Sequence, residues 1–153
     1  MKLTYAKEDL ESARKDLGTL HKLNSEETGA FPDEAFLIEP NWVVYQTLQD
    51  SGVLDIYTVR TEEGVLVGYM MFIIHELLHY KDSVMASTDV LFLRSDLRRG
   101  LAGYKLIKFA LDDVKKTRKV DCISLTMSTK RPFVAIAERL GFKHREQIYH
   151  LEV

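Results

Sequence analysis

The spacing of hydrophobic residues divides the first third of the chain into a short strand and two helices. Leu3–Ala6 is a candidate strand, and Asp9–Lys22 carries leucine and alanine at the intervals of an amphipathic helix. Asn24–Pro40 holds two prolines and many carboxylates, which is typical of a loop with at most a short helical turn. Asn41 is a suitable N-terminal cap for a second helix ending at Gly52.

The middle of the chain reads mainly as β-structure. Residues 55–74 contain two runs of branched and aromatic side chains on either side of the turn Thr61–Gly64, which predicts a β-hairpin. Val84–Leu93 is a further apolar strand. Gly100–Lys116 has helical spacing, and Asp121–Met127 alternates like a strand.

The C-terminal part predicts one more helix and one more strand. Pro132 suits the first turn of a helix, and Gly141 is a suitable residue to end it. Phe142–Leu151 is then expected to return as the last strand. The predicted order is β-α-α-β-β-β-α-β-α-β, which is a mixed α/β fold in one domain spanning residues 1–153.

Composition and charge exclude several classes of function. The chain has 153 residues and a net charge of −2, which gives no electrostatic reason to expect nucleic-acid or membrane binding. Cys122 is the single cysteine, so no internal disulfide can form, which fits a reducing cytoplasm. No apolar run reaches the roughly 18 residues of a membrane span. We therefore expect a soluble cytoplasmic protein.

One short motif suggests a zinc peptidase. In the stretch IIHELLHYK, His75, Glu76 and His79 form H-E-x-x-H, which on a helix places two zinc ligands and a general base together. The preceding run VLVGYMMFII favours a strand instead. In a strand, residues four apart are separated by about 13 Å and cannot share one ion. We therefore expect His75 and His79 to close a strand and open a surface loop, with the metallopeptidase as a remote alternative.

The stretch VLFLRSDLRRGLAGYKLIKFA, residues 90–110, combines the features of an anion site. A buried strand ends at Leu93, a polar turn carries Arg98 and Arg99, and glycines lead directly into a helix. Free backbone N–H groups and the helix dipole then favour an anion above the turn, and the arginines can add charged hydrogen bonds to a phosphate. A plain helix start with solvated arginines is the alternative interpretation.

This unit resembles the GNAT superfamily of acyl-CoA-dependent N-acetyltransferases. Residues 98–103 stand where that superfamily carries R/Q-x-x-G-x-G/A, although Leu101 replaces the middle glycine. Leu140-Gly141-Phe142 matches the "LGF" that opens the family's last strand. The likeness covers the chain from the first helix onward, and the closing E-x-x-Y with other short patterns is similar to GNAT-like proteins encoded by bacteriophages. It implies a central, mostly antiparallel sheet flanked by helices.

The resemblance also implies a place for acetyl-CoA. Backbone N–H groups of residues 99–104 would hold its pyrophosphate, and the end of the strand Val84–Leu93 would pair with its pantetheine arm. The amide near Leu93 would polarise the thioester carbonyl. The cofactor-binding residues implied in this way are Leu91, Phe92, Leu93, Arg98, Arg99, Gly100, Leu101, Ala102, Gly103 and Tyr104.

Asp89 is the first candidate for the base that removes a proton from the attacking amine. It lies in an apolar strand, and strict alternation places it on the same face as Leu91. Burial raises the pKa of a carboxylate, which makes it a better base; a plain hydrogen bond to a loop is the alternative role. Further candidate catalytic residues are His79, Glu146 and Tyr149. Ala137 occupies the position where many GNAT enzymes carry a tyrosine acid, which Tyr149, Tyr104 or water would then replace.

Three functions follow from these patterns, in decreasing order of preference. The first is an N-acetyltransferase, monomeric or homodimeric, that moves the acetyl group of acetyl-CoA to a primary amine and needs no metal. The second is a catalytically weak GNAT-fold protein that binds a partner, which would be a host protein in the bacterial cytoplasm if a bacteriophage encodes the chain. The third is the zinc peptidase.

Overall fold

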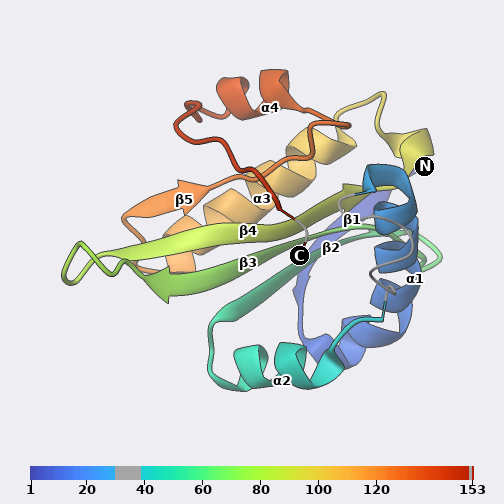
Figure 1. Ribbon diagram of the computed structural model, residues 1–153. Helices are drawn as coiled ribbons and strands as arrows, with labels where there is room; N and C mark the ends of the chain where they lie inside the picture. Colours follow the sequence, from blue (N-terminus) through green and yellow to red (C-terminus); the bar gives the residue numbers. More distant parts are fainter. Residues whose placement is uncertain (30–38, 152) are drawn as a thin grey trace.

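A five-stranded sheet forms the centre of the computed structural model, which describes residues 1–29, 39–151 and 153 (Figure 1). The strands follow their sequence order across the sheet, and every neighbouring pair is antiparallel except the last, β4 and β5, which is parallel. The elements in chain order are β1 (Leu3–Glu8), α1 (Leu10–Thr28), α2 (Trp42–Asp50), β2 (Leu54–Thr61), β3 (Leu66–Glu76), β4 (Val84–Leu93), the 3-10 turn η1 (Ser95–Leu97), α3 (Ala102–Thr117), β5 (Cys122–Ser124) and α4 (Val134–Arg139).

Helices α1 and α2 cover one face of this sheet. The Asp9 side chain accepts a hydrogen bond from the Ser12 N–H and caps α1, whose leucines then pack against alternate residues of the sheet. The helix is longer than predicted, because residues 24–28 continue it. The loop prediction was wrong for these residues, since Gly29, at a φ of 49°, ends the helix by a left-handed turn. Residues 30–38 of the predicted loop lie outside the described residues.

Helices α3 and α4 lie on the opposite face (Figure 1). The fully buried residues Leu106, Ala110 and Val114 of α3 pack against the central strands. Helix α4 is short, and it ends as predicted at Gly141, which has a φ of 90°. The Gly141 N–H donates to the Glu138 carbonyl and the Phe142 N–H to the Ala137 carbonyl, which satisfies the last carbonyls of the helix.

The C-terminal strand is the main departure from the sequence prediction. Residues 142–151 form no strand, and β5 is three residues long where seven were expected. These ten residues carry charged or polar groups at most positions, and nine of them are exposed. The segment therefore has no apolar face to bury, and burial of such a face is what fixes a strand against a sheet.

Across the described part of the chain, none of the helices combines the length and the apolar character that crossing a membrane requires.

Candidate functional site

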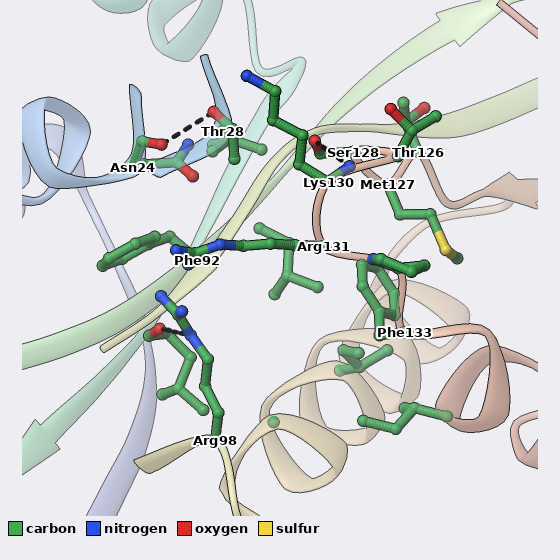
Figure 2. A pocket seen from close by; sticks show the side chains of 18 of the residues that line it. Asn24, Thr28, Phe92, Arg98, Thr126, Met127, Ser128, Lys130, Arg131 and Phe133 are labelled. Carbon is green, nitrogen blue, oxygen red and sulfur yellow. Dashed lines mark hydrogen bonds between the residues drawn. The ribbon is translucent and has the colours of Figure 1, made fainter. Parts of the chain in front are cut away.

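A cleft opens where β4 and β5 separate. Their pairing stops at Ser87 and Ser124, after which a single hydrogen bond of 2.7 Å, from the Thr88 hydroxyl to the Ser124 carbonyl, joins them. The cleft beyond this point encloses about 1090 Å³. It is lined by the C-terminal end of α1, residues 89–93 of β4, the start of α3, the loop 126–133 and the side chains of Ile148 and His150 (Figure 2).

The backbone of β4 turns hydrogen-bonding groups into this cleft. The Arg94 N–H donates to the Val67 carbonyl at 2.8 Å, which fixes the alternation of the ladder between β3 and β4. Leu93 and Leu91, opposite Gly68 and Met70, are then non-hydrogen-bonded pairs, so their N–H and C=O groups point away from β3. An extended chain with amide groups can pair with this edge as a further strand would.

A β-bulge places the Asp89 carboxylate. Val90 lies opposite Met71 and Thr88 lies opposite Phe72, so Asp89 has no opposite residue. The prediction that Asp89 shares a face with Leu91 was wrong, because the extra residue shifts the alternation. Leu91 packs against the core on the α3 side, whereas the Asp89 charge acts on Tyr45 of α2.

Asp89 faces the cleft from the α1 and α2 side of the sheet. Its side chain remains accessible to solvent, but the walls of the cleft limit its hydration, and this burial raises the pKa of the carboxyl. Burial, and then the charge of Asp89, raise the pKa of Tyr45 to about 12. A carboxylate with a raised pKa takes up a proton more readily than an exposed one, which is the property a base needs.

A half-buried histidine that contacts Tyr45, the tyrosine on which the Asp89 charge acts, was missed by the sequence analysis. His21 follows Leu17 by one helical turn on α1, and its Nδ1 lies 2.6 Å from the Tyr69 hydroxyl. Burial lowers the pKa of His21 to about 4, so the ring is neutral at pH 7. Its place on the buried side of the predicted helix was the signal that could have identified it.

The predicted anion loop has the expected local structure. After η1, residues 98–101 turn into α3, and Leu101 at the N-terminal cap offers no side-chain hydrogen bond to the first N–H groups of the helix. These groups are the donors that an anion can satisfy. Gly100 and Gly103 both line the cleft, and a Cβ atom at Gly103 would lie 3.7 Å from Leu93 Cδ2 and 4.0 Å from Ile136 Cδ1.

The two arginines of this loop differ in their surroundings. Arg98 lines the cleft and is already engaged, since its Nε donates to the Leu93 carbonyl at 2.6 Å and its Nη2 to Glu27 Oε2 at 2.5 Å. Arg99 is exposed and lies outside the cleft lining. Tyr104 also lies outside it, with the Arg139 guanidinium 5.0 Å from its ring centre.

The remaining predicted catalytic residues are not brought together with Asp89. His79 is exposed in the turn between β3 and β4, and Glu146 is exposed in the C-terminal segment. The Tyr149 hydroxyl donates to Gln147 at 2.9 Å, and its side chain is 85% exposed. None of these three lines the cleft.

The H-E-x-x-H motif does not form a metal site of the peptidase type. His75 lies in strand β3, as expected, and its Nε2 is 2.8 Å from the Ser87 hydroxyl. His79 follows in the surface turn, so the helix that would join the two rings is not formed. Within the described residues, no three His, Cys, Asp or Glu side chains gather into a group that could hold a metal ion.

Comparison with solved structures identifies the fold. No protein-family model matches the sequence, and no curated protein matches it. A glucosamine-6-phosphate N-acetyltransferase from Arabidopsis thaliana superposes with a TM-score of 0.75 at 14% identity, covering 99% of both chains.

Two further solved structures have the same fold. An aminoglycoside acetyltransferase from an uncultured soil metagenomic sample gives a TM-score of 0.73 at 17% identity, covering 100% of this chain and 98% of that one. A predicted acetyltransferase with acetyl-CoA from Clostridium acetobutylicum gives 0.72 at 11%, covering 99% and 96%. The fold is therefore that of the GNAT acetyltransferases, which confirms the fold class predicted from the loop and the "LGF" motif.

Proposed function

We propose that this protein transfers the acetyl group of acetyl-CoA to a primary amine. The observation that carries the proposal is the edge of β4, whose Leu91 and Leu93 backbone groups point into a cleft that ends at the uncapped start of α3. This edge suits the amide-bearing pantetheine arm, and the helix start suits the pyrophosphate. Similar proteins are described as acetyltransferases of amino sugars and aminoglycosides, which carry amines.

The reaction assigned to the cleft is a direct attack within one complex. The Leu93 N–H polarises the thioester carbonyl, whose carbon lies open to an amine arriving from the α1 and α2 side. Asp89, directly or through water, removes the proton of the amine as the new C–N bond forms and the C–S bond breaks. The thiolate of coenzyme A then takes a proton from water, because no tyrosine is among the described residues that line the cleft.

Acetyl-CoA binding and turnover test this proposal separately. Acetyl-CoA is expected to raise the melting temperature of the protein, because a ligand of the native state stabilises it. Asp89→Asn is expected to keep that shift while slowing release of free coenzyme A from acetyl-CoA and a panel of amines. The absence of a melting shift at millimolar acetyl-CoA would contradict the proposal.

A second candidate keeps the fold and dispenses with catalysis. Two departures from the family pattern favour it: Ala137 stands where many relatives carry the tyrosine acid, and Leu101, 59% exposed, replaces the middle glycine. The protein would then act by binding another protein, a host protein of the bacterial cytoplasm if the likeness to bacteriophage sequences holds. Partner capture that survives Asp89→Asn and needs no acetyl-CoA would support this candidate over the enzyme.

A further inference from the structure

Two arginines from separate loops converge on one carboxylate oxygen beside the cleft. Arg98 precedes α3, Arg131 lies between β5 and α4, and Glu27 belongs to the last turn of α1. Arg98 Nη2 lies 2.5 Å from Glu27 Oε2, and Arg131 Nη1 contacts the same oxygen. The three side chains are 24–35% exposed, so solvent screens them only in part.

Arg98 is held in place before any ligand arrives. Its Nε donates to the Leu93 carbonyl, and its guanidinium lies 5.3 Å from the centre of the Phe92 ring. A guanidinium fixed in this way loses little further freedom when it binds an oxyanion. Arg131 extends across the cleft from its loop toward the Arg98 side, and both arginines line the cleft whereas Glu27 does not (Figure 2).

We propose that Arg98 and Arg131 form an oxyanion subsite for a carboxylate or phosphate group carried by the amine acceptor, and that Glu27 occupies it in the absence of that group. The inference rests on the proposed function, whose acceptor it narrows to amines with an anionic group. Guanidinium pairs match the geometry of carboxylate and phosphate oxygens, and the bound Glu27 carboxylate is an example of this recognition within the protein.

The resemblance to GNAT proteins implies that Arg98 binds the pyrophosphate of coenzyme A. The Arg98 side chain is assigned here to the acceptor instead, and the pyrophosphate is left to the backbone N–H groups at the start of α3. Glu27 belongs to α1, and α1 covers the face of the sheet on which Asp89 and Tyr45 interact. The pyrophosphate is assigned to the start of α3, which lies on the opposite face. The net charge of these side chains also favours binding of an anion. Two guanidinium groups and one carboxylate sum to +1, so a second oxyanion, or one that displaces Glu27, is attracted.

Three primary amines serve as probes: β-alanine carries a carboxylate, O-phosphoethanolamine a phosphate, and ethanolamine neither. Each is titrated by calorimetry, with and without saturating coenzyme A, into the parent protein, Glu27→Gln, Arg131→Ala and the double variant. Asp112→Asn is the matched control, because Asp112 pairs with Lys108 outside the cleft at 59% exposure. Unfolding in urea shows which variants remain folded.

The expected result has opposite signs for the two single variants. Glu27→Gln removes the competing carboxylate and tightens binding of an anionic probe by roughly tenfold, the effect of one charged hydrogen bond. Arg131→Ala weakens that binding by a similar factor and cancels the gain in the double variant. Ethanolamine binding and the Asp112→Asn control stay unchanged, and the relative affinities of the two anionic probes identify the preferred group.

Other results would overturn the inference. If both single variants tighten binding of the anionic probes, the ion pair only restricts access to the cleft. If neither variant changes this binding, the ion pair only holds α1 against the two loops. Should Arg131→Ala unfold, the Nε–H signals of Arg98 and Arg131 in the unmodified protein must shift with β-alanine and not with ethanolamine. Failure of coenzyme A to bind would contradict the proposed function alone, because the anion titrations are also read without it.

Discussion

The strands β1 to β4 and the region from β5 to the C-terminal segment are built in different ways. In the first region, β2 and β3 are buried along nearly their whole length on both faces, and a helix covers each face. In the second, β5 pairs through three residues, α4 has six, and residues 142–151 join no strand. The chain therefore combines a strongly packed sheet with a weakly paired C-terminal region.

The cleft lies at the boundary between these two regions. One wall is the end of β4, which the packed sheet holds in place, and the other is the loop 126–133 with Ile148 and His150. The backbone groups of Leu91 and Leu93 thus belong to a rigid wall, while Arg131 belongs to a wall with few strand hydrogen bonds. Fixed donors suit the proposed thioester reaction, and a wall with few strand hydrogen bonds suits the proposed acceptor site.

The largest difference between the regions is expected in their contribution to stability. Phe72 is 0% exposed on β3, and Phe72→Ala should lower the free energy of unfolding in urea by about 3–5 kcal/mol through loss of burial and a residual cavity. The matched variant Phe133→Ala, at a partly buried position before α4, should cost less than half as much. Equal costs would show that the C-terminal region is packed as firmly as the sheet.

A pH effect of about 3 kcal/mol is expected from His21 in the packed region. Its pKa is lowered from 6.5 to about 4 by burial, so the unfolded chain binds the proton more readily than the folded protein. Stability is therefore complete above pH 6.5 and falls as the pH drops toward 4, at about 1.4 kcal/mol for each pH unit. Urea unfolding between these pH values measures it.

Two histidine variants sharpen this prediction. His21→Gln should flatten the dependence, although it lowers stability at pH 7 by removing the partner of Tyr69. His144→Gln, at an exposed position of the C-terminal segment, is the control for replacing a histidine by glutamine. A pH profile that His21→Gln does not alter would assign the titration to another group.

At the boundary, Gly103→Glu is expected to weaken acetyl-CoA binding more than tenfold, or about 1.4 kcal/mol. The new carboxylate would stand in the first turn of α3, where it repels an anion and fills the cleft beside Leu93. Gly103→Ala is the control, because its Cβ atom meets neighbours only at ordinary contact distances and should preserve binding. If Gly103→Glu binds acetyl-CoA with the affinity of the parent protein in calorimetry, the loop starts the helix and does not bind the pyrophosphate.

The smallest effect is expected from shortening the C-terminal segment. Ending the chain after Lys143 removes a segment whose described residues, 144–151 and 153, are exposed and outside the sheet, so the free energy of unfolding should change by less than about 1 kcal/mol. The melting temperature and the unfolding curve measure this change. A loss of several kcal/mol would mean that the segment pairs with the sheet in solution, as its sequence pattern predicted.

The sequence predicted the elements whose apolar positions are buried. The predicted limits of β4 and the predicted turn Thr61–Gly64 agree with the structure. In these segments the branched residues favour strands and the turn residues favour the connection, so both signals predict the same structure. Phe142–Leu151 shows where such a prediction fails. Most of its side chains are polar, its few apolar residues do not share one face, and the segment is exposed.

The candidate site was predicted only where local pattern determines it. The loop before α3 follows from a strand, a turn and glycines that are adjacent in the sequence, whereas Leu91 and Leu93 were implied by the resemblance to GNAT proteins. The contact of Glu27 with Arg98 and Arg131 joins three distant segments, and no spacing in the chain encodes it. Tertiary packing alone brings these three side chains together.

The bulge in β4 makes the position of the Asp89 carboxylate depend on a count of residues. Ten residues of β4 run beside the nine residues Gly68–Glu76 of β3. Deletion of the codon for Ser87 or Thr88 would restore equal counts, place Asp89 opposite Phe72 and turn its carboxylate toward the other face. Changes in strand length could therefore relocate the proposed base during evolution or engineering while every other side chain of the cleft is retained.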